Sequence, residues 1–273
     1  SAAGTDLTYV CGEYPVMTQW GYADERGHFD HWGGGHIHTF PNEGSARGTV
    51  VFQPGDIVIL PYCRYIAAPV KLEIREGHIV KLEGGMDAKL MRDWLEDGKS
   101  SPQDRDPYAV SHLGWGLNPQ ALWYGIALHG DTPERHRAAA RTFPGNFLFS
   151  TGPNTQGGGK RDTRGHYDVP MRDCTIELDG KVVVERGRIA GYAFFVYEGS
   201  KGVIGDLYVR GSDSRVEGGE NPLEIRLLTH VIETLQRSPG VHRVEAQLLL
   251  HETGAVARPF LSADQQWRIS EVK

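Results

Sequence analysis

The sequence has few cysteines and no long apolar run. It contains only three cysteines, Cys11, Cys63 and Cys174, among 273 residues. An odd number at wide spacing argues against a disulfide framework and a cysteine-rich zinc site, and it fits a reduced, cytoplasmic setting. No apolar run reaches the roughly 18 residues that a membrane-spanning helix needs. We therefore expect a cytoplasmic protein with no membrane partner.

The chain also lacks an excess of positive charge. Its net charge is −6 and its pI is about 6.1. A general binder of nucleic acids or anionic membranes is usually basic, so nucleic-acid binding is disfavoured. Three catalytic motifs are absent as well: Gly-x-x-x-x-Gly-Lys-Ser/Thr, His-Glu-x-x-His and Gly-x-Ser-x-Gly. Their absence argues against a nucleotide hydrolase, a zincin or an esterase.

Alternating apolar and polar residues predict two antiparallel hairpins. Residues 71–75 and 78–82 alternate on either side of a Glu-Gly turn, and residues 174–178 and 181–185 do so around Asp-Gly. A period of two is typical of half-buried strands, and Asp-Gly is a strong hairpin signal.

The middle of the chain changes period. Residues 86–97 have apolar positions at helical spacing, which predicts an amphipathic helix. Residues 121–128 predict a short helix and residues 146–150 a buried strand. Residues 151–165 form a long glycine-rich segment, and loops of that length are uncommon unless they are functional.

The pattern shifts again near residue 190. Residues 189–197 and 202–209 predict buried strands, residues 223–236 a long helix, and residues 241–250 another strand. We therefore predict a mixed α+β protein with two domains, 1–190 and 191–273. The first is rich in antiparallel sheet, and the second is a small β-β-α-β module.

Histidines are the first candidate functional residues. Four of the twelve lie close together, at His28, His31, His36 and His38. On a strand, His36 and His38 would face the same side. Two interpretations remain open: a solvated glycine- and histidine-rich loop, or the rim of a pocket that holds substrate hydroxyls or relays protons.

A second candidate is the pair His166 and Asp168, which also has a spacing of two. On extended backbone both side chains would point to one face. That arrangement suits joint metal ligation, or a ligand beside an acid/base group. The pair alone is a weak signal, because such spacings occur by chance. His112 is another possible ligand, because it lies in a dense segment with two glycines and Asn-Pro.

Eight stretches in order along the first 190 residues carry a family resemblance. They are residues 30–32, 41–44, 48–51, 54–58, 83–88, 112–119, 145–152 and 165–170. Together they resemble the 2,5-dihydroxypyridine 5,6-dioxygenases, iron(II) ring-cleaving enzymes of nicotinate degradation. That family is related in fold to the thermophilic metallo-aminopeptidases, so the resemblance implies an aminopeptidase-like fold. Family members also carry a further amino-terminal domain that helps to close the active site.

The resemblance implies an iron site made by His112, Ser150 and Asp168. The aminopeptidase relatives have Glu at the first of these positions and His at the second. A two-metal peptidase site needs several carboxylates. The set in this chain is sparser and suits one Fe(II) with open positions for a chelating substrate and O₂.

The resemblance assigns further roles. His166 would be an acid/base group beside the substrate, and Arg141 would anchor an anionic substrate oxygen, although it could equally be an ordinary charge at a helix end. Glu43 occupies a metal-ligand position of the aminopeptidases and is expected near the substrate. His31 and His36 are the remaining expected substrate contacts.

Residues 191–273 resemble the carboxy-terminal part of a Gcn5-related N-acetyltransferase. Such proteins hold the pyrophosphate of acetyl-CoA at a helix start. Here that loop corresponds to residues 215–219, where Glu217 places negative charge against a phosphate. We therefore expect a structural or degenerate appendage rather than an active acetyltransferase.

The resulting expectation is an extradiol-type Fe(II) dioxygenase that acts on a dihydroxylated N-heterocycle such as 2,5-dihydroxypyridine. Its partners would be this small molecule and O₂, and it would form a homo-oligomer. Two alternatives remain open. One is a metallo-aminopeptidase-like hydrolase with two metals. The other is a truncated or fused non-catalytic chain with a module that resembles an acetyl-CoA-binding domain.

Overall fold

The protein divides into two compact units, which are described separately. The computed structural model describes residues 1–19, 21, 26, 30, 34–129, 133–189, 191–209 and 222–246. The first unit is Ser1–Arg188 and the second is Ile189–Lys273. Within the described ranges, the helices are all too short or too polar to span a bilayer.

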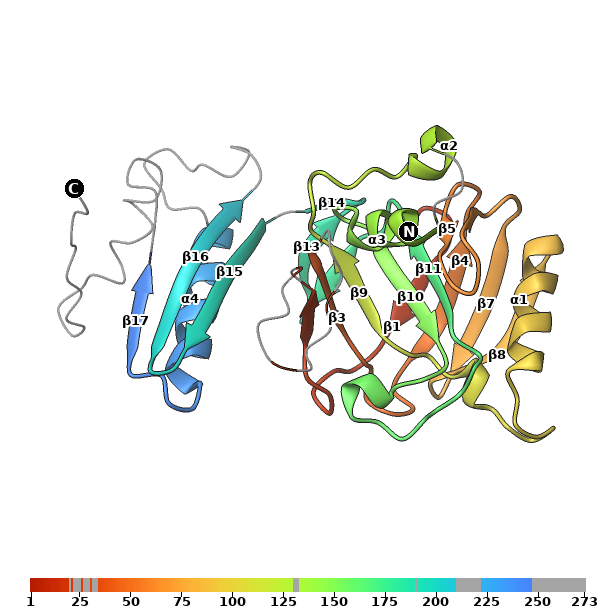
Figure 1. Ribbon diagram of the computed structural model, residues 1–273, viewed down its shortest axis with the longest axis horizontal. Helices are drawn as coiled ribbons and strands as arrows, with labels where there is room; N and C mark the ends of the chain where they lie inside the picture. The colour runs from red at the N-terminus through yellow and green to blue at the C-terminus, as the bar shows by residue number, and fades with distance from the viewer. Residues whose placement is uncertain are drawn as a thin grey trace. The chain divides into compact units, whose positions relative to one another are not determined.

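Two antiparallel sheets form the first unit (Figure 1). One has four strands in the order β1 (Asp6–Thr8), β4 (Arg47–Phe52), β7 (Val70–Arg75) and β8 (His78–Gly84). The other has five strands in the order β11 (Tyr167–Met171), β10 (Phe147–Thr151), β9 (Leu113–Gly116), β3 (His36–Thr39) and β2 (Met17–Gln19). This architecture confirms the mixed α+β class rich in antiparallel sheet.

Smaller elements complete this unit. The short strands are β5 (Ile57–Val58), β6 (Arg64–Tyr65), β12 (Ile176–Leu178), β13 (Lys181–Glu185) and β14 (Arg188–Ile189). The helices are α1 (Met86–Asp97), α2 (Gly125–His129) and α3 (Pro133–Thr142), with 3-10 turns η1 (Asp106–Tyr108) and η2 (Thr155–Gly157).

Both predicted hairpins are confirmed, and turn chemistry explains them. Between β7 and β8, Glu76 and Gly77 have φ angles of 47° and 71°. Between β12 and β13, Asp179 and Gly180 have φ angles of 50° and 71°. Two successive positive φ values match the right-handed twist of the flanking strands, and glycine adopts such values at little cost.

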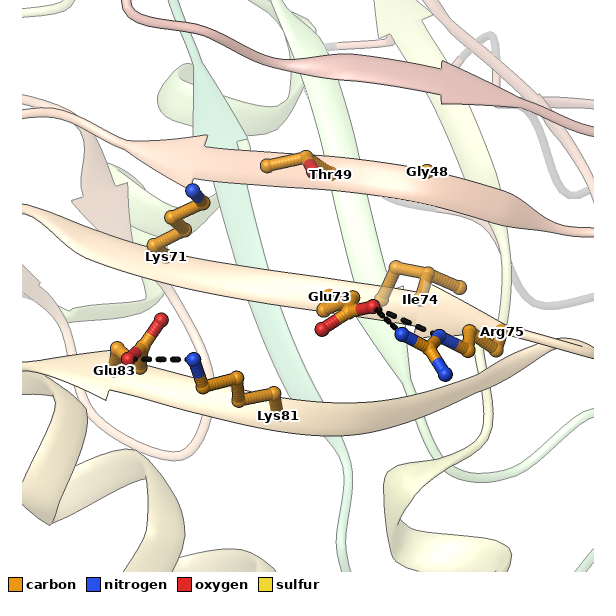
Figure 2. A pocket seen from close by; sticks show the side chains of 8 residues that line it. All are labelled: Gly48, Thr49, Lys71, Glu73, Ile74, Arg75, Lys81 and Glu83. Atoms are coloured by element: carbon orange, nitrogen blue, oxygen red, sulfur yellow. Dashed lines mark hydrogen bonds and ion pairs between the residues drawn. The ribbon is translucent and has the colours of Figure 1, made fainter.

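The outer face of the four-stranded sheet is charged and solvated. Figure 2 shows the side chains that line a hollow on this face. The volume of this hollow is about 340 Å³. Arg75 Nε donates to Glu73 Oε1 over 2.8 Å, and Lys81 Nζ lies 2.9 Å from Glu83 Oε1. These ion pairs are exposed to solvent, so each contributes little to stability.

The main core lies between the two sheets. Val50 and Phe52 of β4 share it with Phe149 of β10, Val169 of β11 and Leu95 of α1. Side chains alternate across a strand, so the residues between these core positions point to the opposite face of the five-stranded sheet. That opposite face carries the candidate site.

A second apolar cluster covers part of this opposite face. It joins Ala140 of α3 to Leu148 of β10 and Trp123. Helix α3 was not predicted, because its apolar residues are small alanines and give no stripe of large side chains. The short helix expected at residues 121–128 is α2, displaced to Gly125–His129.

The predicted glycine-rich loop is present between β10 and β11. Thr151 belongs to β10, and η2 interrupts the loop. Its two ends are tied together, because Thr151 Oγ1 donates to Gly165 O over 3.1 Å. The loop therefore returns the chain directly to the neighbouring strand.

The second unit follows the order strand, strand, helix, strand. Its elements are β15 (Gly191–Glu198), β16 (Lys201–Val209), α4 (Pro222–Arg237) and β17 (Arg243–Ala246). β16 pairs antiparallel with β15 and parallel with β17. Leu228 and Leu235 of α4 pack with Ile204 of β16. Residues 215–219 lie outside the described residues, so the likeness to an acetyltransferase stays a prediction.

Candidate metal centre

Adjacent strands bring the candidate residues to one face of the five-stranded sheet. Ser150 on β10 lies directly opposite Asp168 on β11. His38 on β3 lies opposite Gly114 on β9, and His112 immediately precedes β9. Residues directly opposite each other in an antiparallel pair have neighbouring side chains. Segments far apart in sequence therefore meet at a single point.

Asp168 is the centre of this group. Ser150 Oγ donates a hydrogen bond to Asp168 Oδ1 over 2.5 Å. His166 Nε2 lies 2.9 Å from the same carboxylate oxygen and 3.1 Å from Ser150 Oγ. His112 Nε2 lies 3.7 Å from Asp168 Oδ1. Asp168 and Ser150 are fully buried, whereas 31% of the His166 side chain is exposed.

These residues have the donor set of a metal site. His112, His166 and Asp168 each offer a ligand atom, and the three atoms lie within 4.8 Å of one another. Within the described part of the chain, Asp168 Oδ2 is buried and accepts no hydrogen bond. Arg141 NH2 is 3.7 Å from it. Leaving a buried carboxylate oxygen without a hydrogen bond is costly, so this oxygen is open to a cation or a ligand proton.

The electrostatics keep the central donors in their metal-binding forms. Burial acts to raise the pKa of Asp168, but nearby His166, His112 and Arg141 outweigh it and hold the pKa well below its usual range. Burial lowers the pKa of His112 to about 3, against the attraction of Asp168. The carboxylate is therefore ionised and the His112 imidazole is neutral near pH 7, as metal ligation requires.

His166 and Arg141 respond differently to the same environment. Burial acts to lower the pKa of His166, but the charge and hydrogen bond of Asp168 outweigh it and raise the pKa overall. Burial lowers the pKa of Arg141, and Asp168 opposes that shift. Arg141 lies in the last turn of α3, so it is a helix-end charge that also reaches the site.

A row of imidazoles leads away from Asp168 along the sheet. The ring centroids of His36 and His38 are 5.2 Å apart, those of His38 and His112 are 5.2 Å apart, and those of His112 and His166 are 5.4 Å apart. His36 and His38 are only 2% and 3% exposed, which excludes the solvated-loop interpretation for them. His31 lies outside the described residues.

His36 is the most unusual member of that row. Neither of its ring nitrogens has a hydrogen-bond partner among the residues that the structure describes. Burial lowers its pKa well below the ordinary value, so the ring is neutral. A buried neutral imidazole can still donate from one nitrogen and accept at the other.

Glu43 belongs to a neighbouring network rather than to the Asp168 group. Its carboxylate accepts hydrogen bonds from Tyr14 OH over 2.9 Å and from Asn154 Nδ2 over 2.6 Å. It also pairs with Arg161 NH1. These contacts tie Glu43 to the glycine-rich loop, so its predicted contact with substrate stays a prediction.

Three residues that support the site were not predicted from the sequence. Trp94 Nε1 of α1 donates to His166 O over 3.1 Å, and the Phe40 ring lies 5.8 Å from that of His112. Arg161 donates to backbone carbonyls next to the site. None of the three is part of a local motif. Only the Trp94 position within a predicted amphipathic helix hinted at a buried role.

Comparisons with known proteins identify a family for the first 191 residues. The family model described as NicX, 2,5-dihydroxypyridine 5,6-dioxygenase, matches residues 1–191. The 2,5-dihydroxypyridine 5,6-dioxygenase of Pseudomonas putida KT2440 is 47% identical over 189 residues, which are 69% of this chain and 52% of that protein. The chain therefore spans about half the length of the curated relative that it matches.

Two solved structures are also similar to this chain, to different degrees. The structure of 2,5-dihydroxypyridine dioxygenase from Pseudomonas putida KT2440 matches with a TM-score of 0.63 and 46% identity, over 69% of this chain and 53% of that one. Wild-type AmpT from Thermus thermophilus matches with a TM-score of 0.43 and 17% identity, over 68% of this chain and 47% of that one. A likeness that weak carries no argument, so the aminopeptidase-like fold stays a prediction.

Proposed function

The chain belongs to the 2,5-dihydroxypyridine 5,6-dioxygenase family, and from that premise we propose that it is an iron(II)-dependent, ring-cleaving dioxygenase. Its substrate would be a dihydroxylated N-heterocycle such as 2,5-dihydroxypyridine. The observation that carries the proposal is the buried Asp168 carboxylate, which has Ser150, His112 and His166 around it. Because the chain spans about half the length of its relative, the activity is proposed for the protein that contains these residues.

Iron would be held by His112, Ser150 and Asp168. A neutral imidazole and an ionised carboxylate suit a divalent metal of intermediate softness, and the absence of cysteine among these ligands suits iron(II) better than a thiolate-rich zinc site. Bound iron(II) would supply the redox chemistry that makes O₂ reactive toward the ring. The alternative ligand set replaces Ser150 by His166, whose ring nitrogen Nε2 lies 2.9 Å from Asp168 Oδ1.

His166 would move the proton. Its Nε2 lies within hydrogen-bond distance of both Ser150 Oγ and Asp168 Oδ1. Its side chain is also the most exposed of the group, so it can face an incoming ring. We assign it the removal of a proton from a substrate hydroxyl and the return of that proton to the product.

Arg141 would hold an anionic oxygen of the substrate. Its side chain is 12% exposed and its guanidinium lies near Asp168 Oδ2. A buried guanidinium gives charge-assisted hydrogen bonds that are about twice as strong as neutral ones. Phe40, which is 2% exposed beside His112, would form an apolar wall that excludes water. His31, His36 and Glu43 remain the further proposed substrate contacts.

The partners are a small heterocycle and O₂, and we propose a cytoplasmic homo-oligomer. The net charge of −6 disfavours nucleic acid as a partner.

The test is anaerobic loading with Fe(II), followed by O₂ uptake with 2,5-dihydroxypyridine. We expect consumption of O₂ in step with loss of the substrate's ultraviolet absorbance. An Asp168→Asn variant is the control and should show neither iron binding nor uptake. Two metal ions per chain with peptide turnover would overturn the proposal in favour of a hydrolase. Bound iron without O₂ uptake would overturn the proposed substrate.

A further inference from the structure

His112 lies in an irregular part of the β9–β10 pairing. Gly114 pairs with Leu148, and Val110 pairs with Thr151. Between these two pairs, the chain advances by four residues on the His112 side, from 110 to 114. On the opposite side it advances by three residues, from 148 to 151. One extra residue on the His112 side makes a β-bulge. Bulges redirect side chains and are common beside active sites.

The backbone hydrogen bonds of the strand pairing do not by themselves fix the position of the bulged residue. On its outer side, Ser111 N donates to Ser150 O over 2.9 Å and Gly152 N donates to Ala109 O over 2.8 Å. An extra residue leaves the ladder locally interrupted, so the position of the bulged residue depends on contacts outside the ladder.

Arg161 supplies such contacts from the glycine-rich loop. Its NH2 group donates to Val110 O over 2.9 Å, and its Nε donates to Gly152 O over 3.2 Å. Val110 lies two residues before the proposed ligand His112, and Gly152 lies two residues after the proposed ligand Ser150. One guanidinium therefore links the two paired chain segments just outside the bulge.

The guanidinium is itself held in place. Its NH1 group pairs with Glu43, and the backbone N–H of Arg161 donates to Asn154 Oδ1 over 2.8 Å. Asn154, which is 1% exposed, also donates to Glu43. The Arg161 side chain is only 14% exposed. This network fixes the donor geometry before any ligand binds.

We propose that Arg161 is a positioning residue, which clamps the bulge and so holds His112 at its working distance from Ser150 and Asp168. Arginine suits this task because its planar fork presents donors in fixed directions, whereas a lysine ammonium is a point charge on a flexible stem. The clamp acts through backbone carbonyls and needs no contact between Arg161 and the metal or substrate. The inference rests on the proposed function only in taking His112, Ser150 and Asp168 as metal ligands.

The first experiment measures amide hydrogen exchange in the metal-free protein by NMR. In Arg161→Gln we expect the Ser111 and Gly152 amides to exchange about tenfold faster, because local opening becomes easier. Arg92→Gln is the matched control, since Arg92 NH2 also donates to a strand carbonyl, Leu82 O, but on the other sheet. It should leave both amides unchanged. If Arg161→Gln does not fold, the exchange of the same two amides is measured in Arg161→Lys.

The second experiment uses Co(II) alone as a spectroscopic metal probe. In Arg161→Gln we expect affinity for Co(II) to fall by roughly 10–100-fold, as for other residues that orient metal ligands, with a changed visible absorption band. Arg92→Gln should match the wild type in both readouts. Glu43→Gln keeps both carbonyl contacts of Arg161, so its loss of affinity should be smaller.

The outcomes separate this inference from the proposed function. Unchanged exchange at Ser111 and Gly152 overturns the clamp, whatever the metal does. Faster exchange with unaltered Co(II) affinity and spectrum also overturns the positioning role. If the wild type binds neither Co(II) nor Fe(II), the proposed function fails, and the exchange measurement alone decides whether Arg161 holds the bulge.

Discussion

Ser150 and Asp168 face each other on adjacent antiparallel strands, and the serine hydroxyl donates to the carboxylate over 2.5 Å in a fully buried setting. A hydrogen bond from a neutral hydroxyl to a buried charge is among the stronger ones. This pair fixes the orientation of one Asp168 oxygen and leaves the other available.

Comparing Ser150→Ala with His166→Ala should identify the ligand set. If His112, Ser150 and Asp168 hold the metal, Ser150→Ala weakens Fe(II) binding more than His166→Ala does. We expect a loss of roughly 10–100-fold for Ser150→Ala. Anaerobic titration with Fe(II) measures it. A larger loss in His166→Ala would show that the histidine is the ligand.

Ser150→Ala should also lower the free energy of unfolding of the metal-free protein. Removing the hydroxyl leaves Asp168 Oδ1 with one hydrogen-bond donor fewer, which costs roughly 1–3 kcal/mol. Urea denaturation without metal measures the difference. Ser100→Ala is a control at a serine on the surface, where the hydroxyl meets Asp104, and it should cost less. Equal losses would contradict the importance of the buried pair.

Arg141→Met should impair substrate binding more than metal binding. Loss of a charge-assisted hydrogen bond to an anionic oxygen should raise KM by roughly 10–100-fold, in line with about 1.5–3 kcal/mol per bond. Steady-state O₂ uptake by the protein after loading with Fe(II) gives KM and kcat, and Fe(II) titration gives the metal affinity. A fall in metal affinity with unchanged KM would assign Arg141 to the metal centre instead.

Asp56 should make stability depend on pH. Burial raises its pKa to about 6, against hydrogen bonds from Gln53 N and Arg172 N that act to lower it. The folded state therefore keeps this proton where the unfolded chain, with a pKa of about 3.9, has lost it. Its contribution is present in full below about pH 4 and is lost as the pH rises through about 6, by roughly 2–3 kcal/mol.

Urea denaturation between pH 4 and pH 7, compared between wild type and Asp56→Asn, tests this dependence. The wild type should lose more stability with rising pH than the variant does. Parallel curves for the two proteins would show that the two backbone hydrogen bonds compensate for burial.

Two turn glycines with the same φ angle allow the cost of steric crowding to be separated from the cost of the left-handed backbone conformation. Gly77 and Gly180 both have φ of 71° in two-residue hairpin turns. A Cβ atom at Gly77 would lie 3.1 Å from Gly44 backbone atoms, whereas one at Gly180 would meet nothing within 4 Å. Gly180→Ala should cost about 1 kcal/mol for the left-handed conformation alone, and Gly77→Ala should cost more. Thermal unfolding ranks them, and the reverse order would contradict the crowding argument.

Local sequence patterns predicted several elements of the fold. The alternation around Glu76-Gly77 and Asp179-Gly180 predicted both hairpins, because strand period and turn chemistry are properties of neighbouring residues. The helical spacing of residues 86–97 predicted α1 with its observed bounds. The alanine-rich α3 was missed because its helix is defined by packing rather than by a large apolar stripe.

The amino-acid sequence by itself determined the two hairpins, helix α1, the spacing of two between His166 and Asp168, and the family. The family resemblance grouped His112, Ser150 and Asp168, but only the tertiary structure gave the contacts among them, because cross-strand neighbours come from segments far apart in the chain. The tertiary structure also decided that His36 and His38 are buried and that Arg161 clamps the bulge beside His112. A bulge and its brace depend on the register between strands, and register follows from the packing of whole sheets rather than from any local motif.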